Sequence, residues 1–340
     1  MIDTQVSGYR SVDFSSSDLT VEGVRKVTRS LWKEGVSTYL ATIITTTQER
    51  LMENFAVLAQ ATHDHEIGTS ILGFHLEGPY ISPDDGYRGA HNKLWIRPHD
   101  WNEFFQVNKA AKNKILTITL APEIDSAIDF IQNCVQQGIV VALGHHNAPA
   151  EIIKKAVDAG AAIATHLGNG LANMIHRKNN PLWQQLADDR LMISIIADGI
   201  HLLLEGIQTF YKVEGSDRII LISDVTKLAG MPPGNYSYDA ENVVLTTEGK
   251  VELPDQNVLA GAALSIRKGV GNMILFTHCL LADAIHMASR NPARLYGMND
   301  RGEIKPGKRA DLILFTIEKN NIVIKKTIIM GKVVYMDEKN

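Results

Sequence analysis

The sequence predicts an α/β protein built on a (β/α)8 TIM-like barrel, with a small accessory β-sheet formed by the C-terminal strands. Three observations predict it: eight apolar runs, helical patterns between them, and titratable residues at the ends of several runs. Within each run the hydrophobicity is continuous rather than alternating, as in parallel strands that are buried on both faces. The runs span residues 2–8, 36–43, 71–78, 115–123, 138–146, 161–168, 191–199 and 218–225.

The segments between the runs are typical of helices. Residues 17–35 open with a capping residue and end at a glycine, and residues 46–64 and 148–160 carry comparable signals. A doubly wound open sheet would give the same alternation of strands and helices. However, no Gly-x-Gly-x-x-Gly motif follows an early run, so the dinucleotide-binding form of that fold is not supported. The barrel is therefore the preferred interpretation.

The pattern changes after the eighth run. Short alternating runs broken by Gly, Pro and Asn predict a β-rich insertion at about 234–258. Two helices are expected next, around 266–275 and 279–296, and residues 310–337 again have the composition of strands.

The last strands cannot join a closed barrel, so they are expected to form a domain of their own. We therefore expect a barrel over residues 1–300, including the insertion, and a small β accessory domain over residues 301–340.

Composition excludes several functional classes. The formal net charge of −4, the pI near 6.3 and the lack of a basic block argue against nucleic-acid binding. Cys134 and Cys279 lie far apart, so neither a disulfide framework nor a thiolate zinc site is indicated. No apolar run reaches the ~18 residues of a membrane span, and no secretion signal is evident. A cytoplasmic enzyme of small-molecule chemistry, without a nucleic-acid or membrane partner, is expected.

Titratable residues occupy the ends of five predicted strands. In a barrel these ends meet at one mouth, where active sites lie. In chain order the residues are Glu77, His145 with His146, His166, Asp198 with His201, and Asp224.

One carboxylate and two imidazoles suit a catalytic divalent metal site with a position left open for water. Glu77, His145 and His166 are the predicted ligands. Such an ion lowers the pKa of its water towards ~7, but another group must accept the proton and pass it to the leaving group. Asp224 is placed for that role.

Each residue also has a simpler explanation. A single histidine at a strand end is more often structural than a metal ligand, and Asp224 could be a helix N-cap. The shared position on one rim favours a site. On a strand, His146 would point away from His145. His75 would share the face of Glu77, where it is expected to support the ligand from a second layer.

Eight motifs together resemble the N-acetylglucosamine-6-phosphate deacetylase family of the amidohydrolase superfamily, in order and along almost the whole chain. They are "HLEGPYISPDDGYRGAH", "ALGHHNA", "ATHLGNGLANMIHR", "IIADGIHL", "LISDVTKLAG", "LAGAALSI", "NPARLYG" and "GEIKPGKRADLILF". The resemblance implies a metal-dependent barrel that removes acetate from an N-acetylated amino sugar phosphate.

The resemblance also implies roles for individual residues. Glu77, His145 and His166 match the metal ligands of the family. Asp224 matches a catalytic aspartate that takes a proton from the attacking water and later protonates the departing amine. His91 matches a histidine that helps to polarise the acetyl carbonyl.

Other matches concern the substrate. His201 matches a substrate-binding histidine, and Asn169 and Gly170 match positions that contact the sugar. Arg177 matches an arginine that reaches the sugar phosphate of the neighbouring subunit, which implies a homodimer with shared sites.

Three features depart from the family pattern. Gln5 and Ser7 replace a His-x-His pair that often binds a second metal, so one divalent ion per subunit, zinc or iron, is expected. The segment "HLGNGLAN" differs from the usual His-Leu-aromatic-Asn-Ala, which leaves the identity of the sugar open. The chain starts almost at the first strand, so the N-terminal half of the accessory domain is expected to be missing and strand edges to be exposed.

Deacetylation of N-acetylglucosamine 6-phosphate or a close analogue is the first functional hypothesis. An amidohydrolase acting on another N-acyl compound or on a cyclic amide is the second. A catalytically silent homologue that binds a sugar phosphate or a protein partner is the third.

Overall fold

The computed structural model describes residues 1–238, 241–319 and 321–338, and within them eight parallel strands form the main sheet. The predicted (β/α)8 fold is confirmed. In spatial order the strands are β1 (Ile2–Val6), β4 (Thr38–Ile44), β5 (Ile71–Glu77), β6 (Ile115–Leu120), β7 (Val140–Leu143), β8 (Ile163–Ala164), β9 (Met192–Ile196) and β10 (Ile219–Ile222).

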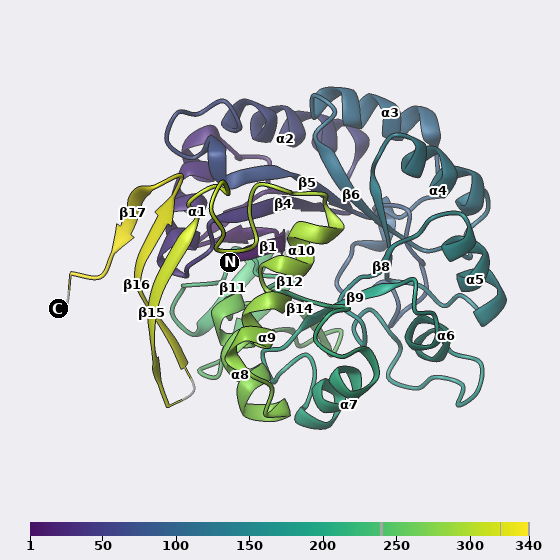
Figure 1. Ribbon diagram of the computed structural model, residues 1–340. Helices are drawn as coiled ribbons and strands as arrows, with labels where there is room; N and C mark the ends of the chain where they lie inside the picture. The colour runs from purple at the N-terminus through teal and green to yellow at the C-terminus, as the bar shows by residue number, and fades with distance from the viewer. Residues whose placement is uncertain (239–240, 320, 339–340) are drawn as a thin grey trace.

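The sheet closes where β10 meets β1. The backbone N–H of Asp224 donates to the carbonyl of Gln5 at 3.1 Å, and the N–H of Ser7 donates to the carbonyl of Val225 at 2.9 Å. Figure 1 shows the helices wrapped around this sheet. The strands are buried on both faces, which explains their continuous hydrophobicity.

The helices follow the expected segments. They are α1 (Val21–Lys33), α2 (Gln48–Ala61), α3 (Trp101–Ala110), α4 (Ala127–Gln136), α5 (Ala150–Asp158), α6 (Pro181–Ala187), α7 (Leu204–Glu214), α8 (Ile266–Thr277), α9 (Leu281–Met287) and α10 (Arg290–Leu295). Hydroxyl groups cap the first two: Thr20 accepts from the N–H of Gly23, and Thr47 from that of Arg50. Two short 3-10 helices flank β5 in the chain: η1 (Gly68–Ser70) precedes it and η2 (Lys93–Trp95) follows it.

The single helix expected over 279–296 is wrong, because the segment forms α9 and α10 with a break at Ala288–Ser289. Ser289 has φ −147° and ends the helical path. Pro292 lies in the first turn of α10, the part of a helix that tolerates a residue without an N–H.

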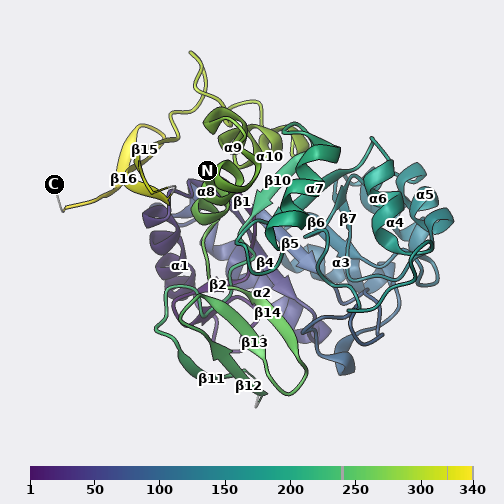
Figure 2. The same ribbon diagram turned by 90° about the horizontal axis from the view of Figure 1, so that it is seen from below.

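Smaller sheets flank the barrel. The insertion forms an antiparallel sheet of β11 (Gly234–Tyr238), β12 (Glu241–Leu245), β13 (Lys250–Leu253) and β14 (Val258–Ala262), and β2 (Gly8–Tyr9) pairs with β3 (Val12–Asp13). The C-terminal sheet comprises β15 (Leu312–Glu318), β16 (Asn321–Ile329) and β17 (Lys332–Met336). Figure 2 shows the insertion and the C-terminal sheet at separate places around the barrel.

The C-terminal sheet has one buried and one open face. Ile322, Ile324 and Ile329 on β16 are buried on the side of the barrel, and β16 contacts both α1 and α8. Leu314 and Val333 on the neighbouring strands are exposed. No helix in the described part of the chain is long and apolar enough to cross a membrane.

Candidate functional site

Three of the predicted site residues occupy equivalent positions just after a barrel strand. His145, His166 and Asp224 each lie two residues beyond the end of a strand, after β7, β8 and β10 respectively. Each has a left-handed backbone, with φ of 53°, 31° and 53°. A non-glycine residue rarely adopts this conformation, which costs about 1–2 kcal/mol. The turn brings all three side chains to the mouth of the barrel.

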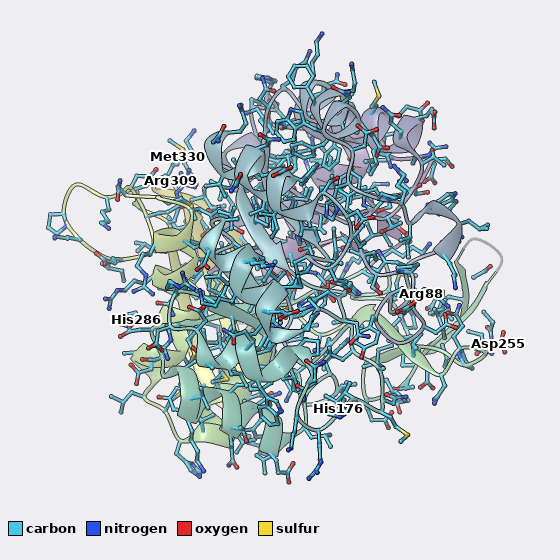
Figure 3. The ribbon with its side chains drawn as sticks, turned by 90° about the vertical axis from the view of Figure 1, so that its right-hand side faces the viewer. Arg88, His176, Asp255, His286, Arg309 and Met330 are labelled. Atoms are coloured by element: carbon cyan, nitrogen blue, oxygen red, sulfur yellow. The ribbon has the colours of Figure 1, made fainter. Side chains whose placement is uncertain are left out.

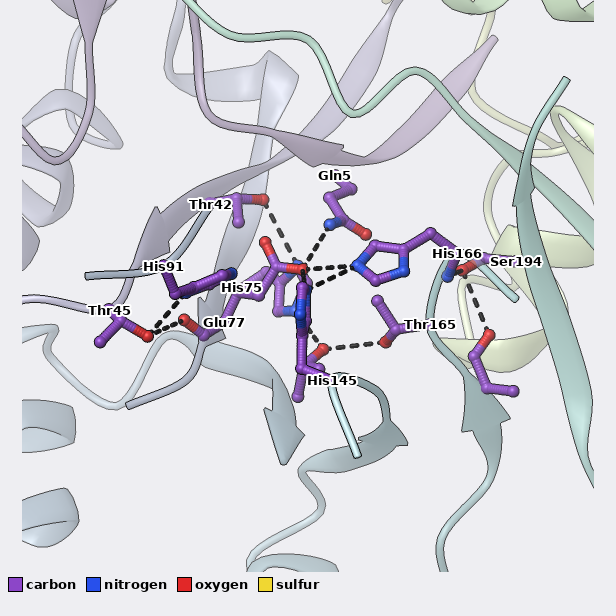
Figure 4. Close-up of polar contacts among 12 residues, drawn as sticks. Gln5, Thr42, Thr45, His75, Glu77, His91, His145, Thr165, His166 and Ser194 are labelled. Carbon is purple, nitrogen blue, oxygen red and sulfur yellow. Dashed lines mark hydrogen bonds and ion pairs between the residues drawn. The ribbon is translucent and has the colours of Figure 1, made fainter. Parts of the chain in front are cut away.

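Glu77 reaches the same place as the last residue of β5, within the regular strand. Its Oε1 lies 3.0 Å from Nε2 of His166 and 3.5 Å from Nε2 of His145. The two Nε2 atoms lie 3.0 Å apart. The three residues are buried and their potential ligand atoms lie within 4.8 Å of one another, so they form a candidate metal site (Figure 4).

The cluster has the donor chemistry that a divalent ion requires. The carbonyl of Tyr87 lies 2.8 Å from Nδ1 of His145, so that nitrogen carries the proton and Nε2 presents its lone pair to the cluster. Two imidazole nitrogens and a carboxylate oxygen that converge in this way suit zinc or a similar ion. The residues therefore fit a metal ion.

The surroundings shift the pKa values of the two buried carboxyl groups, Glu77 and Asp224, in opposite directions. Burial by itself would raise the pKa of Glu77, but the imidazoles of His145 and His166, when Nε2 carries a proton, hydrogen bond to the carboxylate, outweigh that effect and hold the pKa well below its usual range. Asp224 differs: burial, and then the negative charge of Glu77, raise its pKa well above the usual range. A carboxyl group that binds protons readily is suited to acid–base chemistry.

Gln5 connects the two carboxyl groups. Its Nε2 donates to Oε1 of Glu77 at 2.9 Å, and its side chain also hydrogen bonds to Asp224. The sequence identified Gln5 only as the replacement of a metal-binding histidine. Its position on β1, beside β10 in the closed barrel, is what gives it this bridging role.

His75 lies beneath the cluster, as its face on β5 predicts, but its hydrogen bonds run to two hydroxyl groups. Nε2 lies 2.8 Å from Oγ1 of Thr119, and Nδ1 lies 3.4 Å from Oγ1 of Thr42. Burial lowers the pKa of His75 to about 4, so this ring is neutral.

His91 is brought to the cluster by the loop that follows β5. Its ring packs against that of His145, with centroids 4.5 Å apart, and its Nδ1 lies 2.7 Å from Oγ1 of Thr45. Burial, and then the neighbouring His145, lower the pKa of His91 to about 3. Thr45 carried no signal in the sequence, because its partner lies 46 residues away.

Arg88 secures the same loop. Its guanidinium donates to the carbonyl of His91 at 3.0 Å, and to Oε1 of Gln256, in the turn between β13 and β14, at 3.2 Å. Figure 3 shows Arg88 on the side of the molecule where the insertion carries Asp255. The insertion is therefore tied to the loop that carries His91.

His201 is oriented by Asp198. Oδ2 of Asp198 lies 2.7 Å from Nδ1 of His201, and Oδ1 accepts from the backbone N–H groups of Ile200 and His201 at 2.8 Å. The carboxylate thus holds Nδ1–H and leaves Nε2 as the nitrogen available to a ligand.

Asn169 and Gly170 line a small cavity together with His145 and Thr165. Gly170 has φ +61°, and a Cβ there would lie 2.9 Å from Nδ1 of His145. Nδ2 of Asn169 is buried and has no hydrogen-bond partner within the described residues. A hydrogen-bond acceptor about the size of a water molecule would satisfy it, because the cavity holds only about 10 Å³.

Arg177 is not brought into the cluster. It lies on an exposed part of the loop between β8 and α6, and its carbonyl accepts from Nε1 of Trp183 at 3.0 Å. His176 and Asn179 of this loop help to line a larger cleft of 420 Å³ that also includes Tyr87.

The model of the amidohydrolase family matches residues 1–334. The chain belongs to the amidohydrolase family. This amidohydrolase is 31% identical over 99% of its length to the N-acetylglucosamine-6-phosphate deacetylase of Bacillus subtilis, of which the match covers 84%. It is 34% identical over 92% of its length to the N-acetylgalactosamine-6-phosphate deacetylase of Escherichia coli O157:H7, of which 81% is covered.

Solved structures agree with these matches. The N-acetylglucosamine-6-phosphate deacetylase of Thermotoga maritima superposes with a TM-score of 0.86 at 30% identity, over 99% of this chain and 88% of that one. An aspartate-to-alanine mutant of the Mycobacterium smegmatis enzyme, in complex with N-acetyl-D-glucosamine 6-phosphate, gives 0.89 at 26% identity, over 98% and 86%. The predicted resemblance to these deacetylases is confirmed, and this amidohydrolase is a hydrolase that acts on amides.

Proposed function

We propose that this amidohydrolase removes the acetyl group from an N-acetylhexosamine 6-phosphate, with N-acetylglucosamine 6-phosphate as the first candidate. The observation that carries the proposal is the convergence of Glu77, His145 and His166 beside Asp224, in a chain similar to two hexosamine-phosphate deacetylases over more than nine-tenths of its length. The relatives differ in the sugar they are named for, so the epimer must be tested.

Glu77, His145 and His166 would hold one divalent ion, zinc or iron. When bound, such an ion polarises the acetyl carbonyl and makes a neighbouring water molecule a better nucleophile. The negative charge of Glu77 raises the pKa of Asp224, and a cation held by the three ligands would offset that charge.

Asp224 accepts the proton of the attacking water in the proposed reaction. It then delivers that proton to the amide nitrogen as the C–N bond breaks, so that the products are acetate and the amine. Gln5 holds this carboxyl group in place through the hydrogen bond described above. Nε2 of His91 donates a hydrogen bond to the acetyl oxygen, on which negative charge develops.

The sugar is proposed to lie against His201, Asn169 and Gly170. Nε2 of His201 is free for a hydroxyl group, and the buried amide of Asn169 supplies a donor. Because Gly170 has no side chain, its backbone could lie close to the bound sugar.

Arg177 is proposed to bind the phosphate of a substrate held by a neighbouring copy in a homodimer. Its exposed position on the loop supports this role. Replacement by alanine should raise KM for the phosphorylated sugar about 10-fold or more, and should leave KM for the unphosphorylated sugar unchanged. Equal effects on both sugars, or a monomer in sedimentation experiments, would argue against it.

Metal content and acetate release should be measured on one purified sample. The substrates are N-acetylglucosamine 6-phosphate, its galactosamine epimer and unphosphorylated N-acetylglucosamine. About one metal ion per chain, with rapid release from a phosphorylated sugar, supports the proposal. Metal without release from these sugars would favour another N-acyl or cyclic amide substrate, and a chain that binds no metal would favour a silent homologue.

A further inference from the structure

The contact between Thr45 and His91 has a chemical consequence for the site. Thr45 follows β4 directly and is 2% exposed, whereas His91 belongs to the loop after β5 and is 6% exposed. Oγ1 of Thr45 lies 2.7 Å from Nδ1 of His91, a normal length for a hydrogen bond that involves a hydroxyl group. Figure 4 shows the ring of His91 extending from Thr45 towards the cluster around Glu77.

The direction of this hydrogen bond determines what the other ring nitrogen can do. A neutral imidazole has one N–H, so only one of its two nitrogens is a donor. If the Thr45 hydroxyl donates to Nδ1, the proton must be on Nε2. If the hydroxyl accepts from Nδ1–H, then Nε2 is bare and cannot donate to a ligand.

The surroundings of Thr45 favour the first arrangement. Its hydroxyl proton has two acceptors within reach: Nδ1 of His91 at 2.7 Å and the carbonyl of Glu77 at 3.5 Å. The second distance is at the limit of a hydrogen bond, so the hydrogen bond from the hydroxyl group to Nδ1 is the stronger of the two.

The geometry is fixed from both sides. A Cβ at Gly78 would lie 2.1 Å from Oγ1 of Thr45, so only glycine at that position leaves room for the hydroxyl group. Arg88 holds the backbone carbonyl of His91 at 3.0 Å. Gly78 thus leaves room for the hydroxyl group beside His91, and Arg88 anchors the backbone of the loop that carries the ring.

We propose that Thr45 is a positioning residue that fixes His91 in the Nε2–H tautomer, so that the ring donates a hydrogen bond into the mouth of the barrel. This inference rests on the proposed function for its effect on rate. The tautomer itself does not depend on the substrate.

The kinetic test uses the zinc-loaded protein with N-acetylglucosamine 6-phosphate and the variants Thr45→Val, Thr45→Ser and His91→Gln. Valine preserves the shape of threonine and removes the hydroxyl group, so kcat should fall about 10–100-fold while KM and zinc content stay within about 3-fold. Serine keeps the hydroxyl group and should restore kcat to within about 3-fold. Thr46→Val is the matched control, since Thr46 contributes its carbonyl to Arg97, and it should behave like the wild type.

A double variant separates positioning from general damage. In a His91→Gln background the Thr45→Val change should have less than about a 2-fold further effect, because the ring that it orients is gone. The proposal is overturned if Thr45→Val alone keeps kcat within about 3-fold, or if it slows the His91→Gln protein as much as it slows the wild type.

The tautomer can be observed directly in the wild-type protein. Protonated and bare ring nitrogens of histidine have well-separated nitrogen-15 shifts, and the His91 signals are assigned by their loss in His91→Gln. A protonated Nε2 supports the proposal and a protonated Nδ1 overturns it. Failure to release acetate from any hexosamine phosphate would defeat the proposed function, and this spectrum would still decide the role of Thr45.

Discussion

The two sides of the barrel mouth present their site residues differently. On the β5 side, Glu77 lies inside a regular strand of 7 residues. Elsewhere around the mouth, His145, His166 and Asp224 follow β7, β8 and β10, strands of 4, 2 and 4 residues, and point inward through left-handed turns. The first arrangement relies on ordinary strand pairing, and the second requires conformational strain to direct a side chain.

This difference separates Glu77, which regular strand pairing holds in place, from the residues whose strained backbone is held by side-chain contacts. Glu77 is held by a ladder that pairs β5 with β4 and β6 up to the last residue of the strand. The strained residues are held by each other, by Glu77 and by Gln5. Strain that persists at convergent titratable groups is expected of an active site.

The largest expected effect comes from replacing Asp224, one of the three residues in left-handed turns. Replacement by alanine should lower kcat on N-acetylglucosamine 6-phosphate about 10²–10⁴-fold, because Asp224 is the group proposed to carry the proton. Metal content should remain that of the wild type, since Asp224 lies outside the three-residue cluster. Acetate release and metal analysis on one sample check both points, and retained turnover would remove Asp224 from its role.

The next effect concerns Gly78, directly after Glu77. Gly78 has φ +75°, and a Cβ there would collide with Thr45. Alanine should therefore destabilise the fold by about 2–5 kcal/mol, the sum of left-handed strain and overpacking.

Gly138 provides the matched control for Gly78. It has φ +73°, and a Cβ added there would meet no other atom within 4 Å, so alanine should cost only the strain of about 1–2 kcal/mol. Urea unfolding measures both variants. Equal losses would show that the collision at Gly78 is relieved by movement of Thr45.

A third test uses His99, which also follows β5. Its ring is buried against Tyr80 and Phe130, with centroids 5.5 and 5.1 Å away. Burial lowers the pKa of His99 to about 4 from 6.5. Between these values the unfolded chain binds a proton that the folded protein excludes, so stability falls as the pH drops from 6.5 to 4.

This single group should account for a loss of up to about 3 kcal/mol over that range. His99→Phe keeps the aromatic packing and removes the titration. The difference in unfolding free energy between about pH 7 and about pH 5 should therefore be smaller in the variant than in the wild type. An unchanged pH dependence would show that His99 is protonated without unfolding.

The smallest expected effect is a difference in stability between glycine and alanine variants, and it tests directly whether Asp224 is strained and Glu77 is not. At Asp224, glycine should be more stable than alanine by about 1 kcal/mol, because glycine adopts positive φ without penalty. At Glu77, glycine should be less stable than alanine by about 0.5–1 kcal/mol, because the residue lies in a strand. Thermal or urea unfolding of the four variants gives both differences, and the same sign at both positions would contradict the assignment of strain.

Much of the barrel could be predicted because its signals are local. Continuous apolar runs identify strands buried on both faces, and polar residues that follow them identify the mouth. The convergence of Glu77, His145 and His166 at the mouth was predicted in this way, and their role as metal ligands stays a prediction.

The features that could not be predicted depend on contacts between distant parts of the chain. Gln5 bridges Glu77 and Asp224 only because β1 closes the barrel against β10. His99 is buried because the loop after β5 folds it against Phe130 of α4. The left-handed turns at His145, His166 and Asp224 could not be predicted from residue type, because histidine and aspartate adopt positive φ more often than most residues but do not require it.

The constant spacing between strand end and site residue has a consequence for how such proteins diversify. His145, His166 and Asp224 each lie two residues past the end of a strand, β7, β8 and β10 respectively, at the very start of the loop that follows. Insertions, deletions or grafted loops beyond these points would leave the reactive groups in register with the strands. Substrate choice could thus be rebuilt by loop exchange while the chemistry is inherited unchanged.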